Sequence, residues 1–209
     1  MRIKSIFVVV VISLMFAGSI AISDSGEMKR KIDHFEMVAK TGLYDNVKYS
    51  KEEIRRAILK TRGQDSSNPV SSSEIYLSAL VDGFYDNGEK YKLPSMLFVG
   101  MALKESEYKT DVTGVLGEKG ILQVGKQGRN ACRKECGEFN MDPGIQICHG
   151  YCWFSKIKNK TCDGSIRQGL YGYACGRCEP KAKWRKTIDA VRRRYRLWGW
   201  LHVNLGKDI

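Results

Sequence analysis

Apolar residues recur at helical spacing near the C-terminal end of the chain. Trp184, Ile188, Val191, Tyr195 and Trp198 are spaced by 4, 3, 4 and 3 residues, which predicts a helix over about 181–199. The other face of this helix is basic and carries Lys183, Arg185, Lys186, Arg192, Arg193 and Arg196. The pattern therefore predicts an amphipathic helix with one buried face.

Six further helices are predicted from apolar spacing and from capping residues. Ser50 with Glu53, and Ser71 with Glu74, each form a capping box ahead of an apolar run, and Pro94 is typical of a helix start. The second of these helices is expected to end at Asn87-Gly88. The predicted ranges are about 51–62, 71–87, 94–108, 128–138, 143–158 and 164–174. No alternating strand pattern of useful length and no internal repeat is present, so the fold class is expected to be mainly α.

Residues 1–21 have the layout of a secretory signal peptide. Arg2 and Lys4 form a basic start, an apolar stretch follows, and small residues lead up to Ala21. Ile6 to Ile22 covers 17 residues, the short end of what crosses a bilayer, so an uncleaved membrane anchor is the alternative. In both cases the remainder of the chain is expected to be exported to the periplasm or cell envelope.

Turn-forming composition marks a candidate domain boundary. The run Gly-Gln-Asp-Ser-Ser-Asn-Pro over 63–69 is typical of a linker, and residues 23–50 are polar and irregular. Residues 22–70 are therefore interpreted as an N-terminal extension and linker. The main domain is expected to span 71–200, with a C-terminal tail over 201–209.

Composition and charge narrow the range of functions. Hydrophobic residues make up 43% of the 209 residues and charged residues 28%, which excludes a disordered, collagen-like or polytopic membrane protein. The net charge of +12 favours an anionic partner: nucleic acid, a lipid surface or an acidic polysaccharide. Only the run Arg192-Arg193-Arg194 adds to the case for nucleic acid, and a solvated helix face explains it equally well. No nucleic-acid partner is therefore expected.

The seven cysteines all lie within residues 132–178. In an exported chain such a cluster predicts disulfides. A zinc site is the alternative, because Cys175 and Cys178 form a C-x-x-C motif close to His149. No second C-x-x-C and no H-x₃₋₅-H completes a familiar ligand set, so no metal is expected.

The spacing of the cysteines also predicts how they pair. Two of the predicted helices each carry cysteines four residues apart on one face. If these helices run antiparallel the order of the cysteines reverses, provided that the facing Cα atoms lie within about 7 Å. The expected disulfides are Cys132–Cys152, Cys136–Cys148 and Cys162–Cys178, with Cys175 as the alternative partner of Cys162. The favoured pairing leaves Cys175 as a free thiol packed beside Tyr173.

Glu105 is the first candidate for chemistry. It shares a predicted helix face with Phe98, Met101 and Ala102, close to the C-terminal end of the helix. A lone carboxylate is poorly placed there, because desolvation and the helix dipole both disfavour its negative charge. A carboxyl group kept neutral suits a general acid for glycosidic cleavage. The ordinary alternative is a helix-end glutamate paired with a nearby lysine.

The residues after Glu105 complete a motif. Glu105-Ser106-x-Tyr108, followed by Gly117-x-x-Gly120-Ile121-Leu122-Gln123-Val124, resembles the signature of the lytic transglycosylases with a soluble-lytic-transglycosylase, lysozyme-like domain. In that family a catalytic Glu-Ser-x-aromatic precedes a G-x-x-G-[LI]-[ML]-Q-[VI] segment. Physically, the two glycines let the backbone approach a sugar closely, and the glutamine both donates and accepts hydrogen bonds.

Two weaker blocks follow in the family's order, so that the resemblance covers about residues 74–199. Residues 146–154 are similar to an N-[IL]-x-x-G-x-x-[YW]-L helix, with Gln146 in place of the asparagine. Residues 172–176 are similar to an A-Y-N-x-G motif, in which Tyr173 matches the active-site tyrosine and Ala174 replaces the asparagine. Gly114 stands where a serine is common.

The resemblance implies a lysozyme-like helical fold and cleavage of the β-1,4 bond between N-acetylmuramic acid and N-acetylglucosamine in peptidoglycan. Glu105 would protonate the leaving oxygen and then take the proton from the muramyl 6-hydroxyl, which closes a 1,6-anhydro ring. Peptidoglycan glycan strands would be the partner, and no cofactor is needed. The residues implied in substrate binding are Ser106, Tyr108, Gly120, Gln123 and Tyr173.

Two other functions remain open on sequence grounds. A hydrolytic lysozyme on the same scaffold usually needs a second carboxylate; Asp111, Glu118 and Asp163 are available, but none lies in a motif and each is interpreted as a solvated loop charge. A non-enzymatic wall-binding component of an envelope-spanning secretion or phage apparatus is the alternative from another class, with the basic last helix as its contact surface. An intact Glu105 argues against that alternative.

Overall fold

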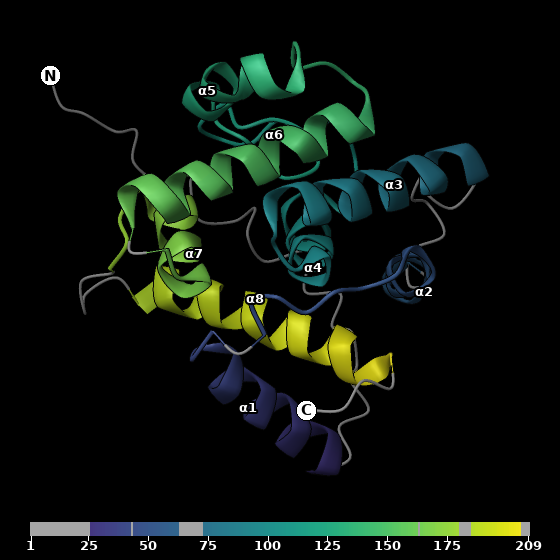
Figure 1. Cartoon of the computed structure of the whole chain (residues 1–209), viewed down its shortest axis with the longest axis vertical. Helices are drawn as coiled ribbons and strands as arrows, with labels where there is room; N and C mark the ends of the chain where they lie inside the picture. The colour runs from purple at the N-terminus through teal and green to yellow at the C-terminus, as the bar shows by residue number, and fades with distance from the viewer. Residues whose placement is uncertain (1–25, 43, 63–72, 163, 180–184, 206–209) are drawn as a thin grey trace, which may run out of the picture.

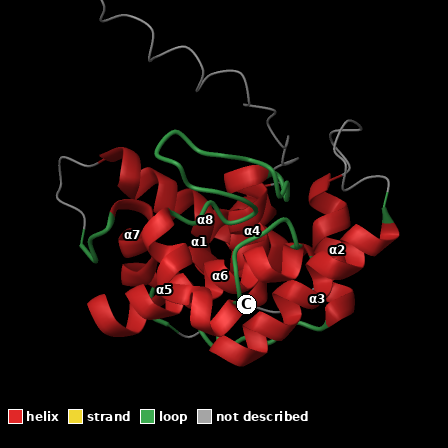
Figure 2. Ribbon diagram, turned by 90° about the horizontal axis from the view of Figure 1, so that it is seen from above, coloured by secondary structure: helices red, strands yellow, loops and turns green. Residues whose placement is uncertain are grey.

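The computed structural model describes residues 26–42, 44–62, 73–162, 164–179 and 185–205. Within these ranges the chain is helical, with two isolated bridges, Thr113–Lys119 and Lys119–Val124, and no β-strand (Figure 2). The helices are α1 (Gly26–Ala39), α2 (Lys51–Arg62), α3 (Glu74–Tyr91), α4 (Ser95–Ser106), α5 (Lys126–Cys136), α6 (Pro143–Lys156), the π-helical turn η3 (Ile157–Thr161), α7 (Ile166–Cys175) and α8 (Arg185–Asn204). The prediction of a mainly α fold is confirmed.

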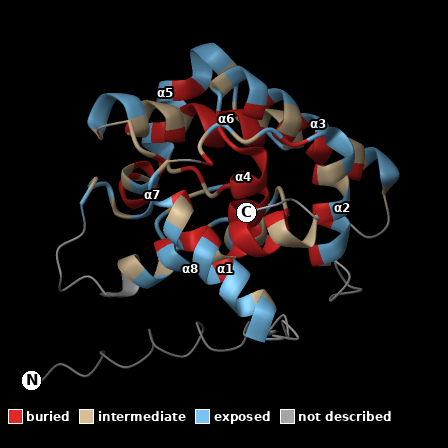
Figure 3. Ribbon diagram, turned by 60° about the horizontal axis from the view of Figure 1, so that its bottom comes forward, coloured by how far each residue is buried: buried red, intermediate tan, exposed pale blue. Residues whose placement is uncertain are grey.

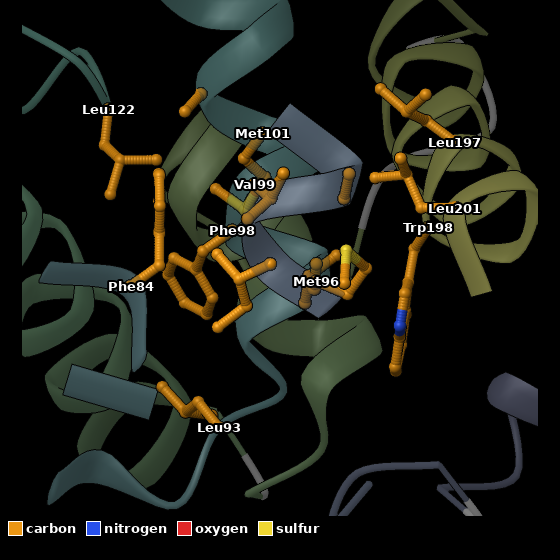
Figure 4. Close-up of a cluster of buried hydrophobic side chains, with 14 of the residues drawn as sticks. Phe84, Leu93, Met96, Phe98, Val99, Met101, Leu122, Leu197, Trp198 and Leu201 are labelled. Carbon is orange, nitrogen blue, oxygen red and sulfur yellow. The ribbon is translucent and has the colours of Figure 1, made fainter. Parts of the chain in front are cut away.

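Helix α4 lies at the centre of the molecule. It is apolar on all sides, with every residue from Ser95 to Ala102 buried, which is the pattern of a helix enclosed by others. Figure 3 shows it surrounded by the other helices. In Figure 4, Phe98 and Met101 lie between Phe84 of α3 on one side and Trp198 of α8 on the other. This enclosure fixes the position of the C-terminal end of α4, where Glu105 lies.

Helix α8 packs against α4 and carries the predicted apolar stripe. Val191, Tyr195 and Trp198 are buried as expected, whereas Trp184 lies outside the described residues. The helix does not end at 199 but continues to Asn204, so residues 201–204 are not a separate tail. The helix continues because its last turn is buried. Leu201 is 1% exposed, and Nδ1 of His202 and the Tyr49 hydroxyl form a hydrogen bond of 2.7 Å.

Residues 26–62 belong to the same core as the rest, which corrects their interpretation as an extension. Helix α1 packs along α8 (Figure 1), and the Phe35 ring stacks on Tyr44 with centroids 4.6 Å apart and meets Trp198 edge-on at 5.1 Å. Helix α2 buries Ile54 and Ile58 completely. The buried stripe of α1 consists of few apolar side chains separated by charged ones, which is why this segment reads as irregular. The linker stretch 63–69 lies outside the described residues.

Capping residues set two helix starts, one of them at a different residue than predicted. Ser50 and Glu53 form the expected capping box, with the Ser50 backbone N–H donating to Glu53 Oε2 at 2.7 Å. The N-cap of α3 is Ser73, whose hydroxyl accepts from the Tyr76 N–H at 3.3 Å; Ser71 lies outside the described residues.

Helix α3 also continues through Asn87-Gly88 to Tyr91, so the predicted end was wrong. Asn87 is buried and its side-chain amide donates to the Gly83 carbonyl oxygen at 2.8 Å, within the helix. Close packing explains why residue 88 is a glycine: a Cβ at this position would lie 2.1 Å from Ser95 Oγ. Lys92, in the left-handed conformation with φ of 52°, ends the helix.

Three disulfides join the cysteines in the predicted pairs. Cys132–Cys152 and Cys136–Cys148 hold α5 against α6, with Cα atoms 6.0 and 5.7 Å apart. Cys162–Cys178 connects the end of η3 to the segment after α7. Cys175 has a free thiol, half-buried, which donates to the Tyr171 carbonyl oxygen at 3.1 Å.

Removing the Cys132–Cys152 disulfide by the double substitution Cys132→Ser/Cys152→Ser is expected to lower the free energy of unfolding by about 2–4 kcal/mol, since the bond restricts the unfolded chain. Chemical denaturation measures the change. Cys175→Ser, the matched control, is expected to change it by less than about 1 kcal/mol. Peptide mapping without reduction that joined Cys132 to Cys136 would contradict the pairing.

The signal or anchor assigned to residues 1–21 lies outside the described residues. Among the helices that are described, none has the length and the apolar character needed to cross a membrane.

Candidate active site

A cleft of about 410 Å³ opens beside the C-terminal end of α4. Its walls come from α4, from the loop 107–125, from α7 and from α8, segments that are distant in the sequence. The lining residues are Glu105, Glu118, Gln123, Tyr173, Ala174, Ala190 and Arg194. Of the residues that the sequence predicts for the site, Glu105, Gln123 and Tyr173 meet in this cleft, whereas Ser106, Tyr108 and Gly120 are not among those lining it.

A sharp turn directly after Glu105 keeps this residue at the cleft. Glu107 and Tyr108 both adopt left-handed backbone conformations, with φ of 54° and 65°. Their N–H groups close the helix by donating to the carbonyl oxygens of Leu103 and Ala102 at 3.2 and 3.4 Å. Two successive non-glycine residues in this conformation cost energy, and such local strain is concentrated at functional sites. The turn ends α4 within one residue of Ser106 and leaves Glu105 in the last helical turn.

Glu105 is paired with an arginine. Its side chain is 21% exposed, and its Oε1 accepts from Nη2 of Arg194, whose side chain is 12% exposed. Tyr173 lies close to both groups: burial raises the pKa of its hydroxyl, the negative charge of Glu105 raises this pKa further, and Arg194 lowers it. The expectations of a lone carboxylate, or of a lysine partner, are thereby corrected to an ion pair between α4 and α8.

Arg194 is the site residue that sequence reasoning missed. It was grouped with Arg192 and Arg193 as part of a solvated basic face, and those two are indeed exposed. At 100° per residue, however, Arg194 lies only about 40° from Trp198 on the helical wheel, at the edge of the apolar stripe. Its position next to the apolar stripe is the feature of the sequence that distinguishes Arg194 from the exposed Arg192 and Arg193. Its Nε and Nη1 atoms are buried and have no hydrogen-bond partner among the residues that the structure describes.

Ser106 faces the core rather than the cleft. Its hydroxyl is buried and donates to the Ile121 carbonyl oxygen at 2.8 Å, with a second contact to the Ala102 carbonyl oxygen at 3.3 Å. Successive side chains on a helix are rotated by about 100°, which explains why Ser106 points to the core while Glu105 lines the cleft. Ser106 therefore ties the end of α4 to the loop that carries Gln123, and it positions the site instead of binding substrate.

Gly120 makes room for a side chain of the protein. It has φ of 75°, and a Cβ there would lie 2.2 Å from Gln146 Oε1. That oxygen accepts from the Ile121 N–H at 3.0 Å, while the Gln146 amide donates to the carbonyl oxygens of Thr110 and Asn140 at 3.0 and 2.8 Å. The glutamine on α6 thus fixes both ends of the loop, and Gly120 allows it to approach.

Gln123 lines the cleft, and Gly114 lies beside its side chain. The Gln123 amide donates to the carbonyl oxygens of Val112 and Gly120 at 3.2 and 2.9 Å, which leaves its Oε1 as an acceptor on the cleft wall. A Cβ at Gly114 would lie 2.6 Å from this Oε1 and 2.6 Å from Glu118 Oε2. The absence of a side chain at Gly114 therefore leaves room for the side chains of Gln123 and Glu118.

Tyr108 lies in the core, which corrects its assignment as a substrate-binding residue. It is fully buried, its hydroxyl forms a 2.9 Å hydrogen bond with Thr61 of α2, and its carbonyl oxygen accepts from the Tyr76 hydroxyl at 2.5 Å. The sequence placed α2 outside the domain, so this partner was not anticipated. Tyr173, by contrast, lines the cleft and donates from its hydroxyl to the Leu122 carbonyl oxygen at 2.7 Å.

Glu118 adds a second carboxylate to the cleft, whereas the sequence suggested a solvated loop charge. Its Oε2 accepts from the Leu116 N–H at 3.0 Å, which fixes the side chain. Asp111 is exposed and does not line the cleft, and Asp163 lies outside the described residues. In the described ranges no three His, Cys, Asp or Glu side chains lie together as metal ligands.

The cleft thus combines the carboxyl group of Glu105, paired with Arg194, a second carboxyl group from Glu118, and the side-chain oxygens of Gln123 and Tyr173. Neither the protein-family models nor the curated proteins compared with the sequence match this chain.

Proposed function

We propose that the protein is a peptidoglycan lytic transglycosylase with a lysozyme-like helical domain. It cleaves the β-1,4 bond between N-acetylmuramic acid and N-acetylglucosamine and leaves 1,6-anhydromuramyl ends. The observation that carries the proposal is the meeting of Glu105, Gln123 and Tyr173 in one cleft. These residues stand at the positions of the family's catalytic glutamate, loop glutamine and active-site tyrosine, and they come from three separate segments.

Glu105 acts as acid and then as base. Its carboxyl proton passes to the glycosidic oxygen as the bond from the muramyl C1 to that oxygen breaks, so the leaving sugar departs as a neutral alcohol. The carboxylate then accepts the proton of the muramyl 6-hydroxyl while that oxygen bonds to C1, and Glu105 regains its starting form. The substrate supplies the nucleophile, so one carboxyl group suffices. Gln123 Oε1 and the Tyr173 hydroxyl oxygen accept hydrogen bonds from the sugar.

Export supports the proposal, because peptidoglycan lies outside the cytoplasmic membrane. Three disulfides within 132–178 are typical of an oxidising compartment, in agreement with the signal or anchor pattern of residues 1–21. The protein accordingly acts in the periplasm or cell envelope. Wall turnover, and a place in an envelope-spanning secretion or phage apparatus, both fit such an enzyme.

Digestion of purified peptidoglycan tests the proposal. The enzyme is expected to release soluble fragments and to reduce the turbidity of a wall suspension. A non-enzymatic wall-binding component would pull down with the walls and release nothing, which would overturn the proposal.

A hydrolytic lysozyme is the second candidate function, and Glu118 is the observation that favours it. A hydrolase needs a carboxylate to activate water or to form a glycosyl intermediate, and Glu118 lines the same cleft as Glu105. Its contact with the Leu116 N–H gives it a structural role as well, which is sufficient in a lytic transglycosylase.

Glu118→Gln separates the two candidates. In a lytic transglycosylase the amide oxygen can still accept from Leu116, so wall-degrading activity is expected to fall less than about tenfold. In a hydrolase the loss of a catalytic carboxylate is expected to cost about 10²–10⁴-fold. Initial rates of turbidity loss measure the difference, with Asp111→Asn, exposed and outside the cleft, as the control.

A further inference from the structure

The guanidinium of Arg194 uses only part of its bonding capacity. An arginine offers five N–H donors in a planar fork that matches a carboxylate through two parallel hydrogen bonds. Here Nη2 alone contacts Glu105, while Nε and Nη1 are buried and find no partner within the described part of the chain. Unpaired buried donors are rare in folded proteins, so these two atoms require an explanation.

The pairing also occupies the group that the proposed reaction needs. Oε1 of Glu105 is held by Nη2 of Arg194, whereas in the proposed first step the Glu105 carboxyl group must contact the glycosidic oxygen. The pair must therefore separate before the glycosidic bond is protonated. Separation without a replacement would leave a mostly buried positive charge uncompensated, which is costly.

A second anion resolves both difficulties. Among the lining residues that the structure describes, Arg194 is the one cation, and the other carboxylate, Glu118, is engaged by the Leu116 N–H. The remaining lining residues are uncharged. An anion that replaces Glu105 on Arg194 must accordingly be brought by the ligand. Arg194 lies on α8, and residues of α8, α4 and α7 line the cleft together. Figure 1 shows α8 beside α4 and α7, both of which it contacts.

We propose that Arg194 recognises a carboxylate of the glycan substrate, which replaces Glu105 on the guanidinium when the strand binds. The inference rests on the proposed function, because the carboxylate is one carried on the lactyl arm of N-acetylmuramic acid. It is either the lactyl carboxylate itself, in strands without peptides, or a carboxylate of the attached stem peptide. As the side chain turns to the ligand, Nε and Nη1 gain an acceptor, and Glu105 is released to contact the glycosidic oxygen. Strands of N-acetylglucosamine alone cannot trigger this exchange.

Binding to the Glu105→Gln protein tests the inference without turnover. Isothermal titration calorimetry compares three soluble ligands: neutral N-acetylglucosamine oligomers, peptide-free peptidoglycan strands, and strands with stem peptides. The protein is expected to bind at least one of the two carboxylate-bearing strands about tenfold or more tighter than the neutral oligomers. A preference for peptide-free strands identifies the lactyl carboxylate, and a preference for peptide-bearing strands identifies the stem.

The preference is expected to disappear in Glu105→Gln/Arg194→Met and to persist in Glu105→Gln/Arg193→Met, because Arg193 is exposed on the same helix. Circular dichroism checks the fold. If the methionine variant does not fold, Glu105→Gln/Arg194→Lys replaces it; the ammonium lacks the fork and is expected to lose most of the preference.

Two results overturn the assignment of Arg194: equal affinity of the Glu105→Gln protein for neutral and carboxylate-bearing strands, or a preference that survives substitution of Arg194. Failure of the proposed function is distinguishable from both. In that case no glycan binds, and wild-type protein leaves purified peptidoglycan intact.

Discussion

Glu105→Gln is expected to lower wall-degrading activity by about 10²–10⁴-fold or more while the fold persists. The amide has nearly the size of the carboxyl group and still offers an oxygen to Nη2 of Arg194, but it cannot deliver a proton to the leaving oxygen or recover one from the muramyl hydroxyl. Initial rates of turbidity loss with purified walls measure the effect, and circular dichroism with thermal unfolding shows that the protein is folded.

The matched control for this substitution is Glu107→Gln. Glu107 is two residues away, caps the same helix and pairs with Lys109 at 3.1 Å on the surface, outside the cleft. A partly exposed pair of this kind contributes little to stability, and Glu107 does not line the cleft, so the change is expected to be nearly silent in activity. Full activity in Glu105→Gln, or an equal loss in Glu107→Gln, would remove Glu105 as the catalytic acid and base.

Phe35→Ala is expected to lower the free energy of unfolding by about 3–5 kcal/mol. The ring is fully buried between Tyr44 and Trp198, and a Cβ at Gly199 would lie 2.8 Å from its Cδ1, so α1 and α8 are packed closely around it. The loss follows from the cavity and the missing contacts. Chemical denaturation of the full chain measures it, and a single transition is expected because both helices share one core.

Met37→Ala on the same helix is the control. Its side chain is 59% exposed, so a change within about 0.5 kcal/mol is expected. If residues 26–62 were only an extension, Phe35→Ala would be as mild as Met37→Ala, or it would remove a separate early transition and leave the main one unchanged.

Long-range features that repeat at helical spacing could be predicted from the sequence. The stripe of α8 spans several turns, so its buried face is evident from Val191, Tyr195 and Trp198. Cysteines four residues apart on two neighbouring helices specify their own pairing once an antiparallel arrangement is assumed. These signals are strong because each depends on a regular geometry that the fold preserves.

The buried face of α1 and the C-terminal end of α3 could not be predicted from the spacing of apolar residues. The apolar face of α1 depends on Ile32, Phe35 and Ala39 among many charged residues, and it becomes a core face only because α8 covers it. Asn87-Gly88 has the composition of a helix end, but burial and a hydrogen bond to Gly83 keep it helical. In both cases tertiary packing overrides local preference.

In the candidate site, too, some residues could be predicted from the sequence and others could not. The motif identified Glu105, Gln123 and Tyr173, which share the cleft, but it gave no means of telling lining residues from supporting ones. Ser106 and Tyr108 follow Glu105 closely and nevertheless face the core, because each step along a helix or a tight turn rotates the side chain. Arg194 and Glu118 are not motif residues. Arg194 lines the cleft because α8 packs beside it, and Glu118 does so because the loop 107–125 forms one of its walls.

The mass of the product ends distinguishes the lytic from the hydrolytic reaction. Purified peptidoglycan is digested with the wild-type protein, and the soluble fragments are analysed by mass spectrometry. We expect 1,6-anhydromuramyl ends, each lighter by one water than a reducing end, and none of these fragments from the Glu105→Gln protein. Reducing muramyl ends from the wild-type protein would contradict the lytic mechanism and identify a hydrolase in which water, and not the substrate's own hydroxyl, attacks the muramyl C1.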